Sequence, residues 1–149
     1  MPLEIRTVCP ELEQQLAEFF SALRLSDEGH FHPHPFTFEY ASELARYCGQ
    51  DMYYLCLDCQ KVLCYGMLRG WDEGFEIPSL GIAVHPDARR AKVGESMMHF
   101  LHSAARWRGA KRVRLKVYEA NIAARSLYEK MGYRFESIED GQLVGLINL

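Results

Sequence analysis

Three basic residues stand between an apolar stretch and a helical pattern, an arrangement that suits the binding of an anion. Arg89, Arg90 and Lys92 follow an apolar run that ends at Val84, and Gly94 comes just after them. The first turn of a helix offers unpaired backbone N–H groups and a partial positive charge, which attract anions. A glycine there lets a ligand approach the backbone closely. These residues predict a phosphate or pyrophosphate site, and a solvated basic loop is the alternative reading.

The segments around this loop indicate a strand before it, and a helix and a further strand after it. Apolar residues recur at helical spacing after the loop, at Met97, Met98, Leu101, Ala104 and Ala105. The stretch "KRVRLKVYE" then alternates apolar and basic residues, which is typical of a half-buried strand. Its apolar positions are Val113, Leu115 and Val117, and its basic positions are Arg112, Arg114 and Lys116.

A second helix follows that strand, and its two ends are marked in the sequence. Asn121 suits the N-cap position, and Gly132 suits the left-handed residue that ends a helix. Over the whole chain the patterns predict the order β-α-α-β-β-β-α-β-α-β-β. This order indicates a mixed α/β sheet with helices on its faces.

Composition restricts the class of protein. The 149 residues are 48% apolar and 25% charged, so residues 1–149 are expected to form a single globular domain. The net charge of −3 argues against nucleic-acid binding, and no apolar run is long enough to span a membrane. The N-terminus lacks the pattern of a secretion signal and the five cysteines are an odd number, which together favour a reduced, cytoplasmic setting.

Two segments resemble the signatures of a known superfamily. "LGIAVHPDARRAKVGESMM" and "VYEANIAARSLYEKMGYRFE" are similar to the two signature segments of the GNAT superfamily, the acyl-CoA-dependent N-acyltransferases, and the likeness runs from about 79 to 136. The resemblance implies a mixed, mostly antiparallel sheet of six to seven strands flanked by about four helices. Strands 4 and 5 would be parallel and splayed. The anion at the basic loop would then be the pyrophosphate of acetyl-CoA.

The resemblance also implies which residues bind the cofactor. Backbone groups of Ile82 and Val84 would hold the pantetheine arm, and one of their N–H groups would polarise the acetyl carbonyl. Lys92 departs from the family pattern, because it stands where relatives have a glycine. Its β-carbon would crowd the phosphates, or its ammonium group would contact one of them. The expected cofactor-binding residues are Ile82, Ala83, Val84, Arg89, Arg90, Lys92, Val93, Gly94, Glu95 and Asn121.

Catalytic roles follow from the same resemblance. Tyr128 matches the tyrosine that protonates the departing thiolate, although packing alone would also explain an aromatic residue on the apolar stripe of its helix. Relatives commonly carry a general base at positions matching Pro78 and Leu80, which are apolar here. Glu76 and Glu73 are the nearest carboxylates, and the histidines between positions 30 and 34 are the remaining candidates. We take Glu76 as the candidate base, acting directly or through water.

The segment "HFHPHPF" holds three alternating histidines, His30, His32 and His34. Relatives commonly use this connection to line the acceptor site, so the three are predicted to bind substrate. A structural loop and a zinc site are the alternatives. The prolines between the histidines favour a polyproline turn that would scatter them, so no metal is expected.

The sequence thus predicts an N-acetyltransferase that moves an acetyl group from acetyl-CoA to a primary amine of a small molecule, an amino sugar being one option. No nucleic-acid or membrane partner is expected, and a homodimer is possible because GNAT relatives are often dimers. The main alternative is a non-catalytic GNAT-like module with weakened CoA binding. A metal-binding protein built on the histidine segment is the third reading.

Overall fold

The computed structural model describes residues 3–26 and 33–149, which form one seven-stranded sheet. Its strand order is β1-β2-β3-β4-β5-β7-β6, and only β4 and β5 are parallel neighbours. The mixed sheet confirms the predicted fold class. The strands are β1 (Leu3–Thr7), β2 (Met52–Asp58), β3 (Lys61–Arg69), β4 (Ser79–Val84), β5 (Arg112–Tyr118), β6 (Arg134–Glu139) and β7 (Gln142–Asn148).

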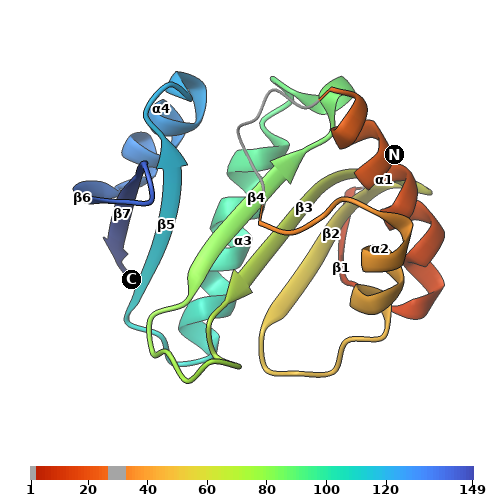
Figure 1. Cartoon of the computed structure of the whole chain (residues 1–149), viewed down its shortest axis with the longest axis horizontal. Helices are drawn as coiled ribbons and strands as arrows, with labels where there is room; N and C mark the ends of the chain where they lie inside the picture. Colours follow the sequence, from red (N-terminus) through yellow and green to blue (C-terminus); the bar gives the residue numbers. More distant parts are fainter. Residues whose placement is uncertain (1–2, 27–32) are drawn as a thin grey trace.

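Helices cover both faces of the sheet, α1 and α2 on one face and α3 on the other (Figure 1). Phe19, Phe20 and Tyr65 belong to the core beneath α1 and α2, whereas Met97 and Leu115 belong to the core beneath α3. The helices are α1 (Glu13–Leu25), α2 (Phe38–Ala45), α3 (Val93–Trp107) and α4 (Ile122–Met131), with the short 3₁₀ helices η1 (Pro10–Leu12) and η2 (Pro86–Ala88). No helix in the described ranges is long and apolar enough to cross a membrane.

The two ends of α4 lie where the sequence predicts them. The Asn121 side chain accepts a hydrogen bond from the Ala124 N–H at 3.3 Å, as an N-cap should. Gly132 ends the helix with a φ of 109°, in the left-handed region that a residue with a β-carbon rarely adopts. Local signals were sufficient to place this helix, which borders the gap between β4 and β5.

The parallel strands β4 and β5 touch only at one end and then diverge (Figure 1). Their single paired position is Ser79 with Arg114, and the Arg114 N–H donates to the Pro78 carbonyl at 3.0 Å. Beyond this point β5 pairs only with β7, from Arg112 to Tyr118. The divergence leaves one edge of β4 without a partner strand in the middle of the sheet.

Candidate functional site

A cavity of about 500 Å³ lies at the splay between β4 and β5. Its walls are the C-terminal part of β4, the basic loop, the first turn of α3 and the inward face of α4. Tyr128 and every expected cofactor-binding residue line it: Ile82, Ala83, Val84, Arg89, Arg90, Lys92, Val93, Gly94, Glu95 and Asn121. The structure therefore brings together residues that are up to 46 positions apart in the sequence.

The free edge of β4 offers backbone hydrogen-bonding groups to this cavity. The Pro78 carbonyl points toward β5, whereas the His85 N–H points the other way and donates to Leu63 of β3 at 2.8 Å. Backbone groups alternate in direction along a strand, so those of Ile82 and Val84 face the side from which β5 has diverged. An extended ligand can pair with them as an added strand would.

The N-terminus of α3 presents a second set of free donors. No side chain caps this helix, and within the described ranges the N–H groups of Val93, Gly94 and Glu95 have no backbone or side-chain acceptor. The first backbone bond of the turn runs from the Ser96 N–H to the Lys92 carbonyl at 3.2 Å. Three unpaired N–H groups and the positive end of a 15-residue helix thus border the cavity, which suits a phosphate group.

The basic loop adds positive charge, and its backbone is strained. Arg90 and Lys92 have φ values of 75° and 59°, in the left-handed region that favours glycine. The side chains of Arg89, Arg90 and Lys92 are exposed and form no hydrogen bond or ion pair with another described residue. Lys92 therefore adopts a left-handed backbone conformation although it has a β-carbon. Its ammonium group is free to bind an anion.

Two neighbouring residues reduce the obstacles to an anion at this place. The Glu95 carboxylate pairs with Lys130 of α4 at 3.2 Å, so its negative charge is offset on the side away from the loop. A β-carbon at Gly94 would lie 3.2 Å from Val84 Cγ2, a contact so close that the Val84 side chain or the helix end would have to shift slightly. The glycine thus keeps the helix end close to the strand that bears the free N–H groups.

Tyr128 projects from α4 into the same cavity. Only 8% of the residue is exposed, and burial raises the pKa of its hydroxyl to about 12. The hydroxyl has no hydrogen-bond partner among the residues that the structure describes, while the neighbouring Tyr133 ring packs 6.0 Å away, centroid to centroid. Tyr128 is therefore a protonated donor at neutral pH whose hydrogen is uncommitted.

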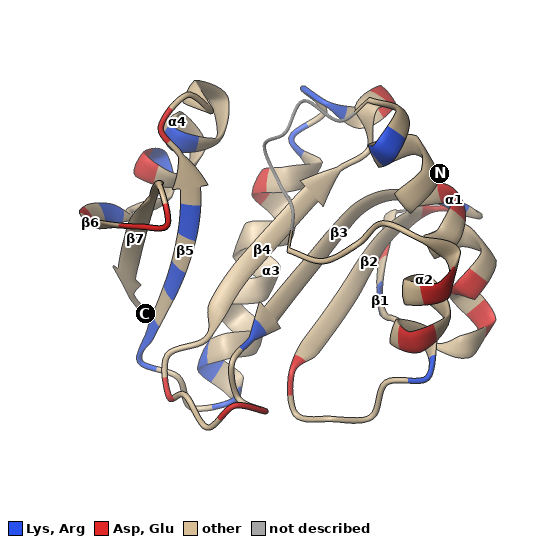
Figure 2. Cartoon of the chain, in the orientation of Figure 1, with Lys and Arg blue, Asp and Glu red and all other residues tan. Residues whose placement is uncertain are grey.

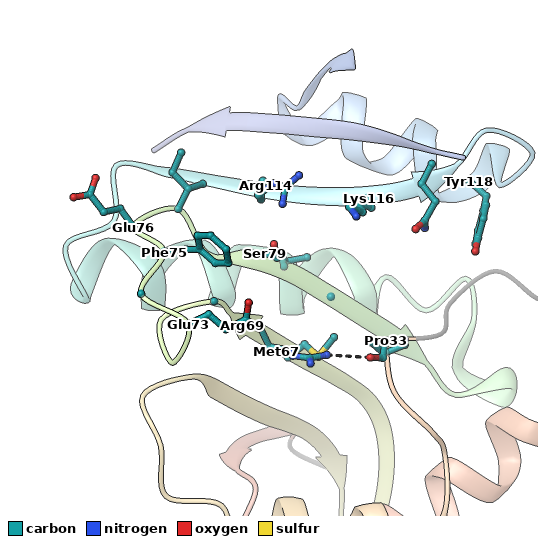
Figure 3. A pocket seen from close by; sticks show the side chains of 16 residues that line it. Pro33, Met67, Arg69, Glu73, Phe75, Glu76, Ser79, Arg114, Lys116 and Tyr118 are labelled. Carbon is teal, nitrogen blue, oxygen red and sulfur yellow. Dashed lines mark hydrogen bonds between the residues drawn. The ribbon is translucent and has the colours of Figure 1, made fainter. Parts of the chain in front are cut away.

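A second cavity of about 700 Å³ lies next to the first one (Figure 3). It shares Leu80, Gly81 and Lys116 with the first cavity, so the two meet at the point of divergence. Its other walls come from β3, β5 and the segment that connects β3 to β4. The remaining lining residues are Pro33, Met67, Arg69, Gly70, Glu73, Gly74, Phe75, Glu76, Ile77, Ser79, Arg114, Tyr118 and Gln142.

Comparisons with known proteins agree with this geometry. The model of the acetyltransferase (GNAT) family matches residues 12–133, which is most of the chain. The chain belongs to the GNAT family.

Solved structures share the fold at low sequence identity. The PaiA N-acetyltransferase from Thermoplasma acidophilum, in complex with coenzyme A, is 16% identical with a TM-score of 0.82, and all of both chains is covered. An acetyltransferase of the GNAT family from Streptococcus pneumoniae is 17% identical with a TM-score of 0.83, over 99% of each chain. The ribosomal-protein-S18-alanine N-acetyltransferase from Escherichia coli is 18% identical with a TM-score of 0.74, over 99% of this chain and 94% of that one. No curated protein matches the sequence.

Glu76 lies at the outer end of the second cavity of this GNAT chain. Figure 3 shows its exposed carboxylate at the opposite end of the cavity from Tyr118 and directed away from the gap between the strands. Pro78 is fully buried, and Leu80 is 6% exposed, so neither position supplies a proton acceptor.

His34 is held inside the fold and does not line either cavity. Its Nδ1 lies 2.8 Å from the Pro35 carbonyl and so donates to it, which leaves Nε2 to accept from the Tyr65 hydroxyl at 2.9 Å. Burial lowers the pKa of the ring to about 4, so the ring is neutral. Of the described residues of this segment, Pro33 lines the second cavity and Phe36 lines the first. His30 and His32 lie outside the described residues.

The cationic lining of the second cavity is the feature that the sequence did not reveal. Arg69, Arg114 and Lys116 all border it, together with Ser79 and Tyr118. The alternation of Arg114 and Lys116 with apolar residues indicates only a polar strand face. Which cavity that face borders depends on the pairing of β3, β4 and β5, for which the sequence carries no local signal.

Proposed function

We propose that this chain is an acyl-CoA-dependent N-acetyltransferase that acetylates a primary amine of a small molecule, with acetyl-CoA in the first cavity and the amine in the second. The observation that carries this proposal is the convergence of free β4 backbone groups, unpaired α3 N–H groups and Tyr128 on one cavity. The geometry fits a long ligand that carries a diphosphate beyond an extended arm. Acetyl-CoA would supply a thioester-activated acetyl group.

The residues of the first cavity would bind different parts of acetyl-CoA. The N–H groups of Val93, Gly94 and Glu95 would donate to diphosphate oxygens, and the unpaired cations of the basic loop would neutralise the charge. Backbone groups of Ile82 and Val84 would bond to the pantetheine amides and to the acetyl oxygen. A donor fixed on an oxygen that gains charge contributes about 3–4 kcal/mol in comparable enzymes.

Acyl transfer then requires two proton movements. The amine nitrogen would form a bond to the acetyl carbon, and the bond from that carbon to sulfur would break. The Tyr128 hydroxyl would give its proton to the leaving sulfur, and Glu76 would receive the proton of the amine through water. The raised pKa of Tyr128 keeps this donor protonated at pH values where the amine loses its own proton.

Titration calorimetry and a CoA-release assay with a panel of primary amines test the proposal. We expect acetyl-CoA to bind with micromolar or tighter affinity and at least one amine, amino sugars included, to release CoA. Arg89→Ala should weaken cofactor binding, whereas Lys111→Ala, an exposed cation outside both cavities, should not. No binding heat at high micromolar acetyl-CoA would refute the enzyme.

A non-catalytic ligand-binding module is the second candidate, favoured by the apolar residues at Pro78 and Leu80 and by the strained Lys92. It predicts that acetyl-CoA or another ligand binds while no amine in the panel is acetylated. Release of CoA that depends on Tyr128 excludes it.

A further inference from the structure

The floor of the second cavity holds a row of polar side chains that runs across three strands. In the sheet register, Ser79 of β4 pairs with Arg69 of β3 on one side and with Arg114 of β5 on the other. Adjacent strands lie about 4.8 Å apart, so the two arginine backbones are separated by about 10 Å with a serine between them. All three residues line the cavity, and Figure 3 shows them from within it.

The same face of β5 continues the positive charge toward the point where the cavities meet. Residues alternate between the two faces of a strand, so Lys116 follows Arg114 on the cavity side. Figure 2 shows the basic residues of β5 beside the gap and the acidic residues of the β6–β7 turn on the other side of β5. Lys116 borders both cavities. An acceptor that enters through the second cavity would therefore contact these basic residues before its amine reaches the acetyl group.

The protein's own carboxylates neutralise these cations unevenly. Arg114 bonds to Glu139 at 2.6 Å, and Lys116 lies 3.3 Å from Asp140. Arg69 donates from Nη1 to the Pro33 carbonyl at 3.1 Å and has no carboxylate partner among the residues described. A guanidinium group has five donors, so Arg69 and Arg114 each keep donors for a ligand. Among the described residues, Arg69 is the member of this group that has no carboxylate partner.

From this row we propose that the acceptor carries an oxyanion, a carboxylate or a phosphate, as well as its amine. The oxyanion binds to Arg69, Arg114 and the Ser79 hydroxyl, and the amine points toward Lys116 and the meeting point of the cavities. Guanidinium groups bind both kinds of oxyanion with paired hydrogen bonds, which gives direction as well as affinity. The inference rests on the proposed function, because it names the acceptor class of that enzyme.

Matched acceptor pairs test this inference through the CoA-release assay. The pairs are 4-aminobutyrate against its amide and glucosamine 6-phosphate against glucosamine. We expect kcat/KM to be about 10- to 100-fold higher for the anionic member of at least one pair. This factor corresponds to the free energy of a hydrogen bond to a charged group. The pair that shows the preference identifies the oxyanion as carboxylate or phosphate. Equal or reversed preference in both pairs, or no turnover of any of the four while acetyl-CoA binds, overturns the inference.

Variants test whether the preference for anionic acceptors comes from the row of Arg69, Ser79 and Arg114. Arg69→Met should reduce the ratio of anionic to neutral kcat/KM to near 1, while Arg69→Lys, which keeps the charge, should retain part of it. Arg112→Met is the matched control, because Arg112 is an exposed cation on the same face of β5 that lines neither cavity. If Arg112→Met lowers the ratio as much as Arg69→Met does, the preference comes from overall charge and the assigned site is wrong.

A binding measurement separates this inference from the proposed function. Thermal denaturation is followed with glucosamine 6-phosphate, with 4-aminobutyrate and with their neutral partners, all without acetyl-CoA. Stabilisation by an anionic compound that is lost in Arg69→Met but kept in Arg112→Met supports the oxyanion site even if acetyl-CoA does not bind. Binding of acetyl-CoA without any anion-selective stabilisation or turnover leaves the enzyme proposal intact and refutes the acceptor class.

Discussion

Replacing Lys92 by glycine and by alanine separates backbone strain from charge at the predicted phosphate loop. Lys92 combines a left-handed φ of 59° with an exposed, unpaired ammonium group at the cavity. Glycine removes both the β-carbon and the charge, whereas alanine removes the charge and keeps the β-carbon. The difference between the two variants therefore measures the strain, and the change that they share measures the charge.

The expected effect on stability follows from two opposing terms. A residue with a β-carbon costs about 1–2 kcal/mol in the left-handed region. Glycine returns this cost but loses about 0.4–1 kcal/mol through the greater freedom of the unfolded chain. Lys92→Gly should therefore stabilise the protein by about 0.5–1 kcal/mol, which raises the Tm by about 1–4 °C in a chain of this size. Lys92→Ala should leave the Tm nearly unchanged.

The expected effect on acetyl-CoA affinity has the opposite sign. The ammonium group is exposed, so its attraction to a phosphate should contribute about 1 kcal/mol, close to a 5-fold change in Kd. Both variants should lose this contribution at low salt, and the loss should shrink at 0.5 M salt because exposed charges are screened. Titration calorimetry with acetyl-CoA at two ionic strengths gives the values, and Lys111→Ala serves as the control. Tighter binding by Lys92→Gly than by the native protein would refute this reasoning and show that the β-carbon crowds the phosphates.

Three further measurements concern Tyr128, Glu76 and the buried His102. Tyr128→Phe should lower kcat by about 100-fold with little change in acetyl-CoA affinity, and unchanged turnover would remove its role as acid. Glu76→Gln should lower kcat by about 10-fold or more, and an unchanged kcat would assign the base elsewhere. His102 bonds to the Tyr133 hydroxyl at 2.7 Å, and burial lowers its pKa to about 4. The unfolded chain takes up this proton near pH 6.5, so the free energy of unfolding should fall as pH drops from 6.5 toward 4. Urea denaturation should show a shallower fall for His102→Gln than for the native protein, and an equal fall in the two proteins would refute this effect of burial.

The local parts of the fold could be predicted from the sequence because each depends on nearby residues. Asn121 and Gly132 define the ends of α4 through hydrogen bonds and a backbone angle that involve only adjacent residues. The alternation from Arg112 to Val117 likewise indicates a strand with one apolar face. Such signals do not depend on the partner strand. The structure confirms the element order that they predicted.

The acceptor side could not be predicted in the same way. His34 alternates with two other histidines, a pattern that gave no indication of its partner Tyr65, which lies 31 positions later. The row of Arg69, Ser79 and Arg114 likewise depends on the register of two strand pairs. A basic residue on a strand face is usually solvated, and only the three-dimensional arrangement shows that this face borders a cavity.

The divergence of β4 from β5 explains why both candidate subsites occur in one place. A parallel pair that continued past Ser79 would satisfy the backbone groups of Ile82 and Val84 and would close the sheet between the two cavities. Because the pairing ends there, the β4 edge stays free on the cofactor side and Lys116 borders both cavities. Gly81 contributes no side chain at the meeting point, where Leu80 and Lys116 are the other residues common to both cavities. Specificity for the acceptor must then come from the neighbouring side chains of β3 and β5, which is where the unbalanced charge of Arg69 lies.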